Sequence, residues 1–261
     1  MLTAVASSTT ADPTPGDLTA TDTFLVRKGP SQGERYVRGV FPSIMGRPAD
    51  NPAVTFWGAE FKTYANKFPN HTMLVPLGII DSAEYRHQRI REAYQRILHR
   101  AASTADVTYW TGRLGVGGMS YQRFELNLLD SHEFLAPIAG GVCGAVYQAV
   151  LDRAPTTHEC PPNPIAGAVY VAFVQVLQES NEAQERIIAD RYQRSVGRAP
   201  SALDIYVWLI AFHQGMSPEA LWANLLVSGE VLAKYPATQD DYGQPIGSVV
   251  PTSGTGFGYT P

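Results

Sequence analysis

Cysteine, charged side chains and long apolar runs are scarce in this chain, and each scarcity excludes a class of protein. Only Cys143 and Cys160 are cysteine among 261 residues, and no Cys-x-x-Cys pair occurs. This excludes a disulfide-rich framework and a cysteine-based zinc ribbon. Charged residues form 17% of the chain, and the formal net charge is −4. Duplex binding draws on many phosphate contacts from lysine and arginine, so this balance argues against a nucleic-acid partner.

One charge-free stretch of 18 residues, 134–151, is the candidate for a membrane span. It contains Pro137, Gln148 and three glycines, which make it too weakly hydrophobic, so we expect a buried linker followed by a helix. The first eight residues lack both the basic start and the apolar run of a signal peptide. The compartment stays open: incorporation into an assembly after synthesis in the cytoplasm, or export by a leaderless route.

Motifs for catalysis and metal binding are also missing. The sequence has no His-Glu-x-x-His, and residues 158–160, His-Glu-Cys, lack the later Cys-x-x-Cys of a zinc deaminase. The glycines of 115–118 lack the lysine of a phosphate-binding loop, so they predict a turn. We therefore expect no catalytic residue, no metal site and no cofactor. We favour a free pair of cysteines, with a disulfide as the alternative.

The chain contains a motif that occurs four times: an aromatic residue, five further residues and an arginine. The arginines lie 53, 53 and 45 residues apart, and each is followed by a Ser-x-Glu triplet whose serines lie 49, 49 and 48 apart. The arginines are Arg47, Arg100, Arg153 and Arg198, and the serines are Ser82, Ser131, Ser180 and Ser228. Repeats of this length are typical of stacked helical units that bind other molecules.

Further residues keep the same register. A helix N-cap type stands three residues after each arginine, and in two copies it extends to a capping box, 103–106 and 201–204. Ten residues after the arginine, Trp57, Trp110 and Trp208 are expected to occupy equivalent, largely buried positions. In the third copy, prolines within 161–164 replace the start of the helix, which predicts an irregular unit.

A second turn is marked by Gly-Met-Ser at 118–120 and again at 215–217. Glycine ends one helix and serine caps the next, with Pro218 at its first position. The sequence therefore predicts an all-α fold: a tandem helical repeat of about four units, with extended arms at both ends. The N-terminal arm is 1–33, the repeat domain is 34–241 with units at 36–87, 88–136, 137–184 and 185–235, and the C-terminal arm is 242–261.

These residues resemble a bacterial helical domain of unknown function that recurs in tandem in secreted and cell-surface proteins, some with calcium-binding RTX repeats. The resemblance rests on Met45–Asp50, Thr108–Arg113, Asp130–Phe134 and Val196–Ser201, and it extends over about residues 36 to 235. The same rhythm is similar, more weakly, to the helical domain of phycobilisome linker polypeptides, which join antenna discs. Neither family has a catalytic motif, so the resemblance implies a structural or interaction role.

The arginines carry two interpretations. We expect the four repeat arginines to be structural, bonding to free helix carbonyls and to a nearby Ser-x-Glu carboxylate. The segment 86–100 also places Arg86, Arg89, Arg96 and Arg100 on one helical face. That face is either solvated and paired within the chain, or an electropositive strip that docks an acidic partner surface.

The two arms lack the apolar periodicity of a helix, so we expect them to become ordered on a partner. Phe24, Tyr242, Phe257 and Tyr259 are their candidate anchors. The function that we expect is a non-enzymatic linker that joins protein subunits of a large assembly such as an antenna, a surface layer or a virion. Copies of the chain itself are among the candidate partners. The alternatives are a leaderless secreted or surface protein that binds a glycan or protein ligand, and an enzyme with an unrecognised site.

Overall fold

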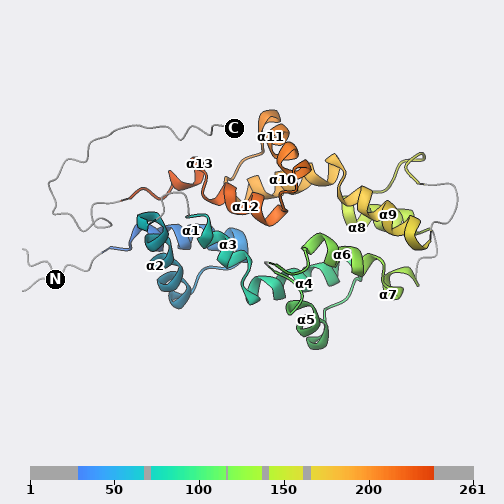
Figure 1. Ribbon diagram of the computed structural model, residues 1–261, viewed down its shortest axis with the longest axis horizontal. Coiled ribbons are helices and arrows are strands. Elements are labelled where there is room, and N and C mark those ends of the chain that lie inside the picture. The colour runs from blue at the N-terminus through green and yellow to red at the C-terminus, as the bar shows by residue number, and fades with distance from the viewer. Residues whose placement is uncertain (1–28, 68–71, 116, 137–140, 161–165, 238–261) are drawn as a thin grey trace, which may run out of the picture. The chain divides into compact units, whose positions relative to one another are not determined.

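The computed structural model describes residues 29–67, 72–115, 117–136, 141–160 and 166–237, and these residues are helical without a named strand, which confirms the all-α class (Figure 1). Residues Gln32–Pro236 form one compact unit. The expected C-terminal arm, 242–261, and residues 1–28 of the expected N-terminal arm lie outside the described residues, and the first described helix begins at Gln32, within the expected arm 1–33. The helices are α1 Gln32–Met45, α2 Asn51–Lys67, α3 Leu74–Ile80, α4 Ala83–Ile97, α5 Thr104–Thr111, α6 Tyr121–Leu129, α7 His132–Leu135, α8 Val142–Leu151, α9 Gly167–Gln178, α10 Asn181–Ser195, α11 Ala202–His213, α12 Pro218–Leu226 and α13 Gly229–Leu232.

The chain turns sharply just before each repeat arginine. The preceding residue has a left-handed backbone in all four cases, with φ between 53° and 85°. These residues are Gly46, His99, Asp152 and Gly197. A left-handed residue directly after a helix is the common way to end it, because its geometry returns free N–H groups to the last carbonyls. The helices α1, α4, α8 and α10 therefore each stop two or three residues before the arginine that follows.

Each Ser-x-Glu triplet begins a helix. Its serine is the N-cap, and the serine hydroxyl accepts a hydrogen bond from the backbone N–H three residues later. The glutamate therefore lies in the first helical turn, where a negative charge is favourable. The expected capping boxes at Ser103 and Ser201 are both present, and Pro218 is the first residue of α12.

The third copy differs from the others, as its prolines predict. No helix begins at Thr156, where Thr156–Glu159 forms a turn. A disulfide joins Cys143 of α8 to Cys160 beyond this turn, with Cα atoms 5.7 Å apart. Our expectation of a free pair was therefore wrong, because spacing along the chain does not reveal that the turn brings Cys160 back to α8. The disulfide ties this loop to the fold where the capped helix of the other copies is missing.

The start of the described chain packs against its end. Helix α1 contacts α10, α3 contacts α12, and α6 contacts α9 (Figure 1). Two buried hydroxyls stabilise this packing by hydrogen bonds. The Tyr36 hydroxyl donates to the carbonyl of Leu226 at 3.2 Å, and the Tyr170 hydroxyl donates to the carbonyl of Leu129 at 2.8 Å. Both acceptors are the second residue of a Leu-Leu pair. The helices thus differ from an open solenoid, in which each unit meets only its neighbours.

Among the described helices, none combines the length and the apolarity that a bilayer crossing requires. The segment 134–151, a span candidate by its lack of charge, contains the end of the short α7 and the separate α8.

Candidate functional site

Each of the four repeat arginines binds the glutamate of the next Ser-x-Glu triplet through two nitrogens of its guanidinium group. The pairs are Arg47 with Glu84, Arg100 with Glu133, Arg153 with Glu182, and Arg198 with Glu230. In the fourth pair, Nε and Nη2 of Arg198 each lie 2.9 Å from a carboxylate oxygen of Glu230. This two-pronged geometry is the strongest arrangement available to an arginine and a carboxylate. Each arginine thereby fastens the end of one helix to the start of another.

In all four copies, the guanidinium group makes two further contacts of the same kind. Nη1 donates to the carbonyl oxygen of the residue that follows the arginine, at 2.9 to 3.1 Å. The guanidinium carbon lies 4.8 to 5.1 Å from the ring centroid of the aromatic residue six positions earlier. These rings belong to Phe41, Tyr94, Tyr147 and Tyr192. We call each such set of contacts an arginine clamp.

Three clamps include a second acid six residues after the arginine. Arg100 binds Asp106 at 2.9 Å and Arg198 binds Asp204 at 3.0 Å, and both aspartates also complete a capping box. In the third copy Glu159 takes this place, at 2.8 Å from Arg153, and accepts from the backbone N–H of Thr156. Glu159 belongs to the triplet that superficially resembles a metal motif, and its observed role is structural.

The clamps of Arg100, Arg153 and Arg198 favour the charged form of their acids. Burial raises the pKa of Asp106, but hydrogen bonds from Arg100 and Ser103 outweigh it and lower the pKa to about 2. Hydrogen bonds from Arg153 and from the Thr156 backbone lower the pKa of Glu159 to about 2. Arg100 likewise lowers the pKa of Glu133 by its hydrogen bond. A depressed carboxylate pKa contributes stability above its unfolded value of about 4 and loses it as the pH falls through the folded value.

We therefore expect the unfolding free energy to fall between about pH 4.5 and pH 2, which chemical denaturation at a series of pH values would measure. Asp106→Asn keeps the shape of the cap but removes the charge, so it should cost about 1 kcal/mol at pH 7 and weaken this pH dependence. Glu179→Gln, at the exposed C-terminus of α9, is the control and should leave the dependence unchanged. Equal pH profiles for both variants would contradict the role of the clamps.

The three register tryptophans are partly buried and pack against the hydrophobic core. Two of them share one setting, since Trp110 donates to the hydroxyl of Tyr94 and Trp208 to that of Tyr192, each at 2.9 Å. Trp57 has a phenylalanine, Phe41, at the matching place and therefore no hydroxyl to bind. Its ring lies over the backbone of Gly78, where a side chain would collide with it.

The four arginines of the predicted strip are engaged inside the chain. Arg86 donates to the carbonyl and carboxylate of Asp81, and Arg89 contacts Glu92 and Glu125. Arg96 binds Glu125 at 2.6 Å and the Ala149 carbonyl, and Arg100 belongs to a clamp. The face is thus paired with acids of its own chain instead of forming an open positive strip, and part of it lines a cavity.

The other expected partner-binding residues, Phe24, Tyr242, Phe257 and Tyr259, lie outside the described residues. Within the parts of the chain that the structure describes, no three His, Cys, Asp or Glu side chains gather in a way that would hold a metal ion.

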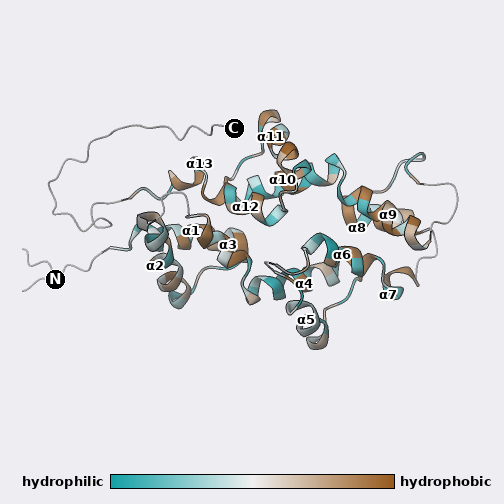
Figure 2. Ribbon diagram, in the orientation of Figure 1, coloured by the Kyte–Doolittle hydropathy of each residue, from teal (hydrophilic) through white to brown (hydrophobic). Residues whose placement is uncertain are grey.

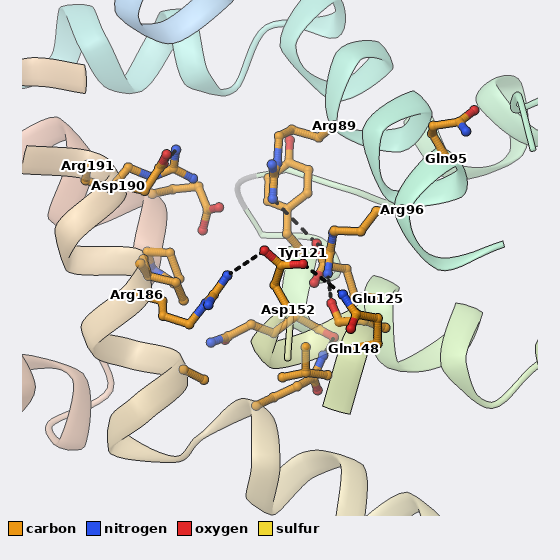
Figure 3. A pocket seen from close by; sticks show the side chains of 18 of the residues that line it. Arg89, Gln95, Arg96, Tyr121, Glu125, Gln148, Asp152, Arg186, Asp190 and Arg191 are labelled. Carbon is orange, nitrogen blue, oxygen red and sulfur yellow. Dashed lines mark hydrogen bonds and ion pairs between the residues drawn. The ribbon is translucent and has the colours of Figure 1, made fainter. Parts of the chain in front are cut away.

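The cavity has a volume of about 620 Å³ and opens between α4 and α6 on one side and α8, α10 and α12 on the other (Figure 3). Five arginines line it, together with four acids and several glutamines. The five arginines are Arg89, Arg96, Arg186, Arg191 and Arg194. The volume is that of an ordinary small-molecule site. Sequence reasoning missed this cavity because its two walls come from helices far apart in the chain.

No family model, curated protein or solved structure matches this chain. The resemblances to the tandem bacterial domain and to phycobilisome linkers therefore stay predictions.

Proposed function

We propose that this chain is a non-enzymatic structural protein, a helical repeat of four units that joins protein subunits in a larger assembly, with a second copy of itself as its first partner. The observation that carries the proposal is an exposed apolar face on α11. Four clamps with the same contacts support the four units.

Helix α11 is apolar on nearly every side, yet little of it is buried. Leu203, Tyr206, Val207 and Ile210 are 70, 63, 50 and 39% exposed, whereas Phe212 is buried. Their spacing of three, four and seven residues places them on one helical face, and α11 is largely brown in the hydropathy view (Figure 2). An exposed apolar face of this kind is typical of a surface that another protein covers.

The near absence of charge on this face of α11 favours a second apolar surface as its partner. Between Leu203 and Ile210 the only charged residue is Asp204, which is held by Arg198 and by its own cap at Ser201. Two copies of α11 placed face to face thus bring apolar side chains together without like-charge repulsion. Such a contact is self-complementary, as a two-fold dimer requires. A charged surface would lose its solvation against this face.

The same outward position is apolar in three clamps. Nine residues after the arginine stand Phe56, Tyr109 and Val207, which are 57, 52 and 50% exposed. Repeat proteins commonly bind through a surface built from equivalent positions of successive units. This recurrence supports a chain with several contact points, as a linker needs, and agrees with the resemblance to phycobilisome linkers.

The test is the oligomeric state of the purified protein, measured by light scattering after size exclusion over a range of concentrations. We expect a dimer, and we expect Tyr206→Glu with Val207→Glu to give a folded monomer because two buried charges oppose the contact. Thr108→Glu is the matched control, since Thr108 is the exposed residue of α5 that corresponds to Tyr206. A wild-type monomer at every concentration would contradict the proposal.

Truncation to residues 34–241 separates the two possible surfaces. A truncated dimer assigns the contact to α11, whereas loss of the dimer assigns it to the ends of the chain. A dimer that appears only after truncation would mean that these ends cover α11.

A second candidate function is a secreted or surface protein that binds a glycan or protein ligand. The disulfide between Cys143 and Cys160 favours it, since stable disulfides are typical of oxidising compartments. Fractionation of producing cells distinguishes the two candidates: the linker is recovered in a large particle, and the surface protein in the medium or on the cell exterior.

A further inference from the structure

The walls of the cavity between α4, α6, α8, α10 and α12 contain buried donors for which the described residues provide no acceptor. The side chain of Arg191 is 8% exposed, and its Nη1 binds Asp190 at 2.9 Å, but its Nε has no partner among the described residues. The same is true of Nε of Arg89 and of the hydroxyl of Tyr121. All three residues line the cavity (Figure 3). A buried donor without an acceptor is destabilising, so three together indicate a site for an acceptor-rich group.

The electrostatics favour a negative acceptor. Burial lowers the pKa of Arg191, and the nearby positive charge of Arg89 lowers it further. Burial also disfavours the charge of Arg89, but nearby groups, Tyr85 and Glu125 first among them, outweigh it and raise the pKa of Arg89. Arg191 is therefore the guanidinium whose charge is not fully compensated within the described chain. Two of the four acids that line the cavity each bind two arginines: Asp190 binds Arg191 and Arg194, and Glu125 binds Arg89 and Arg96.

Arg191 is also held rigidly in place. Its guanidinium carbon lies over the ring of Trp222, 3.9 Å from the centroid, and Trp222 donates a hydrogen bond to Ser195 at 2.9 Å. A stacked guanidinium keeps its edge free for planar oxyanions while its face is covered. The positions of these donors thus come from the core of the fold.

We propose that this cavity binds a small organic oxyanion, a carboxylate or a phosphate ester, whose oxygens accept from Arg89, Arg191 and Tyr121. Apolar walls at Val150, Ile187 and Pro218 receive the organic part of the ligand. The binding does not depend on the assembly role, since the cavity lies within one chain.

The direct measurement is the arginine Nε–H signals in ¹H–¹⁵N spectra, recorded while inorganic phosphate or malonate is titrated into the full chain. Sodium chloride at equal ionic strength is the control. We expect saturable shifts of two signals, which Arg89→Lys and Arg191→Lys would assign. The two titrations distinguish the head groups, because the tighter anion identifies the preferred chemistry. Shifts that chloride reproduces, or that do not saturate, overturn the proposal.

Tyr121→Phe removes a hydroxyl that has no partner in the described chain, so it should leave the fold intact and weaken binding about tenfold, as the loss of one charge-assisted hydrogen bond does. Tyr85→Phe is the matched control. The Tyr85 hydroxyl is equally unpartnered, but Tyr85 does not line the cavity, so affinity should not change.

A second variant, Glu219→Gln, is expected to change the affinity in the opposite direction, which a partial loss of folding would not do. Glu219 lines the cavity, and burial raises the pKa of its carboxyl. Glu219→Gln removes a negative charge that opposes the ligand and should therefore strengthen binding. Unchanged affinity in both Tyr121→Phe and Glu219→Gln would show that the anion binds elsewhere.

Discussion

Replacing Trp222 with alanine is expected to lower the unfolding free energy by about 3 to 5 kcal/mol, the usual cost of removing a large aromatic side chain from a core. Trp222 is 1% exposed, the most enclosed of the four tryptophans. Its indole N–H donates to Ser195, and its ring faces Arg191 on one side. The substitution therefore leaves a cavity and removes the surface against which a buried guanidinium rests.

Urea denaturation monitored by circular dichroism measures this effect. Domains of this kind are stable by about 5 to 15 kcal/mol, so Trp222→Phe is included as a milder change that keeps a ring in place. Trp208→Ala is the matched control because Trp208 is half-buried, and it should cost less. An equal or larger loss for Trp208 would mean that the register tryptophans form the centre of the core.

Local features of this fold were predictable from the sequence because they follow from short-range chemistry. The capping boxes at Ser103 and Ser201, the N-terminal Pro218 and the loss of a helix after Arg153 depend on residues within one turn of each other. The periodic arginines and Ser-x-Glu triplets also pointed to helix ends. The structure adds what joins them: a guanidinium that holds one helix end to a helix start 29 to 37 residues further along the chain.

Long-range packing was not predictable in the same way. Trp222 has no counterpart at the same register in other copies, and its burial depends on Tyr85 of α4 and Arg191 of α10, which are distant in sequence. Arg86, Arg89 and Arg96 lie on α4, but Arg100 does not share their helical face, because α4 ends at Ile97 and the chain turns at the left-handed His99. The charges that meet these arginines, moreover, come from α6 and α7 as well as from α4.

The disulfide between Cys143 and Cys160 was likewise not predictable from the sequence, and its removal is the second change with a large expected effect on stability. Removing the disulfide by a double substitution, Cys143→Ser with Cys160→Ser, is expected to lower the unfolding free energy by about 3 kcal/mol. The reason is that a bridge spanning 17 residues restricts the unfolded chain, and a loop of about this length is worth that amount in the chain-entropy model. The third copy is also where the bridge replaces a missing capped helix, so the loss should be concentrated there.

Thermal unfolding with and without a reducing agent tests this expectation, together with alkylation and mass spectrometry to count free thiols. The wild type should lose stability on reduction, and the double variant should be insensitive to the reducing agent because it has no bridge to break. Hydrogen exchange should show faster opening of α8 and of the 154–160 loop in the variant, while α4 and α12 keep their protection. Two free thiols in the protein isolated from its native source, with unchanged stability on reduction, would contradict the bridge. They would also remove the observation that favours an oxidising compartment, and leave the linker role as the better supported function.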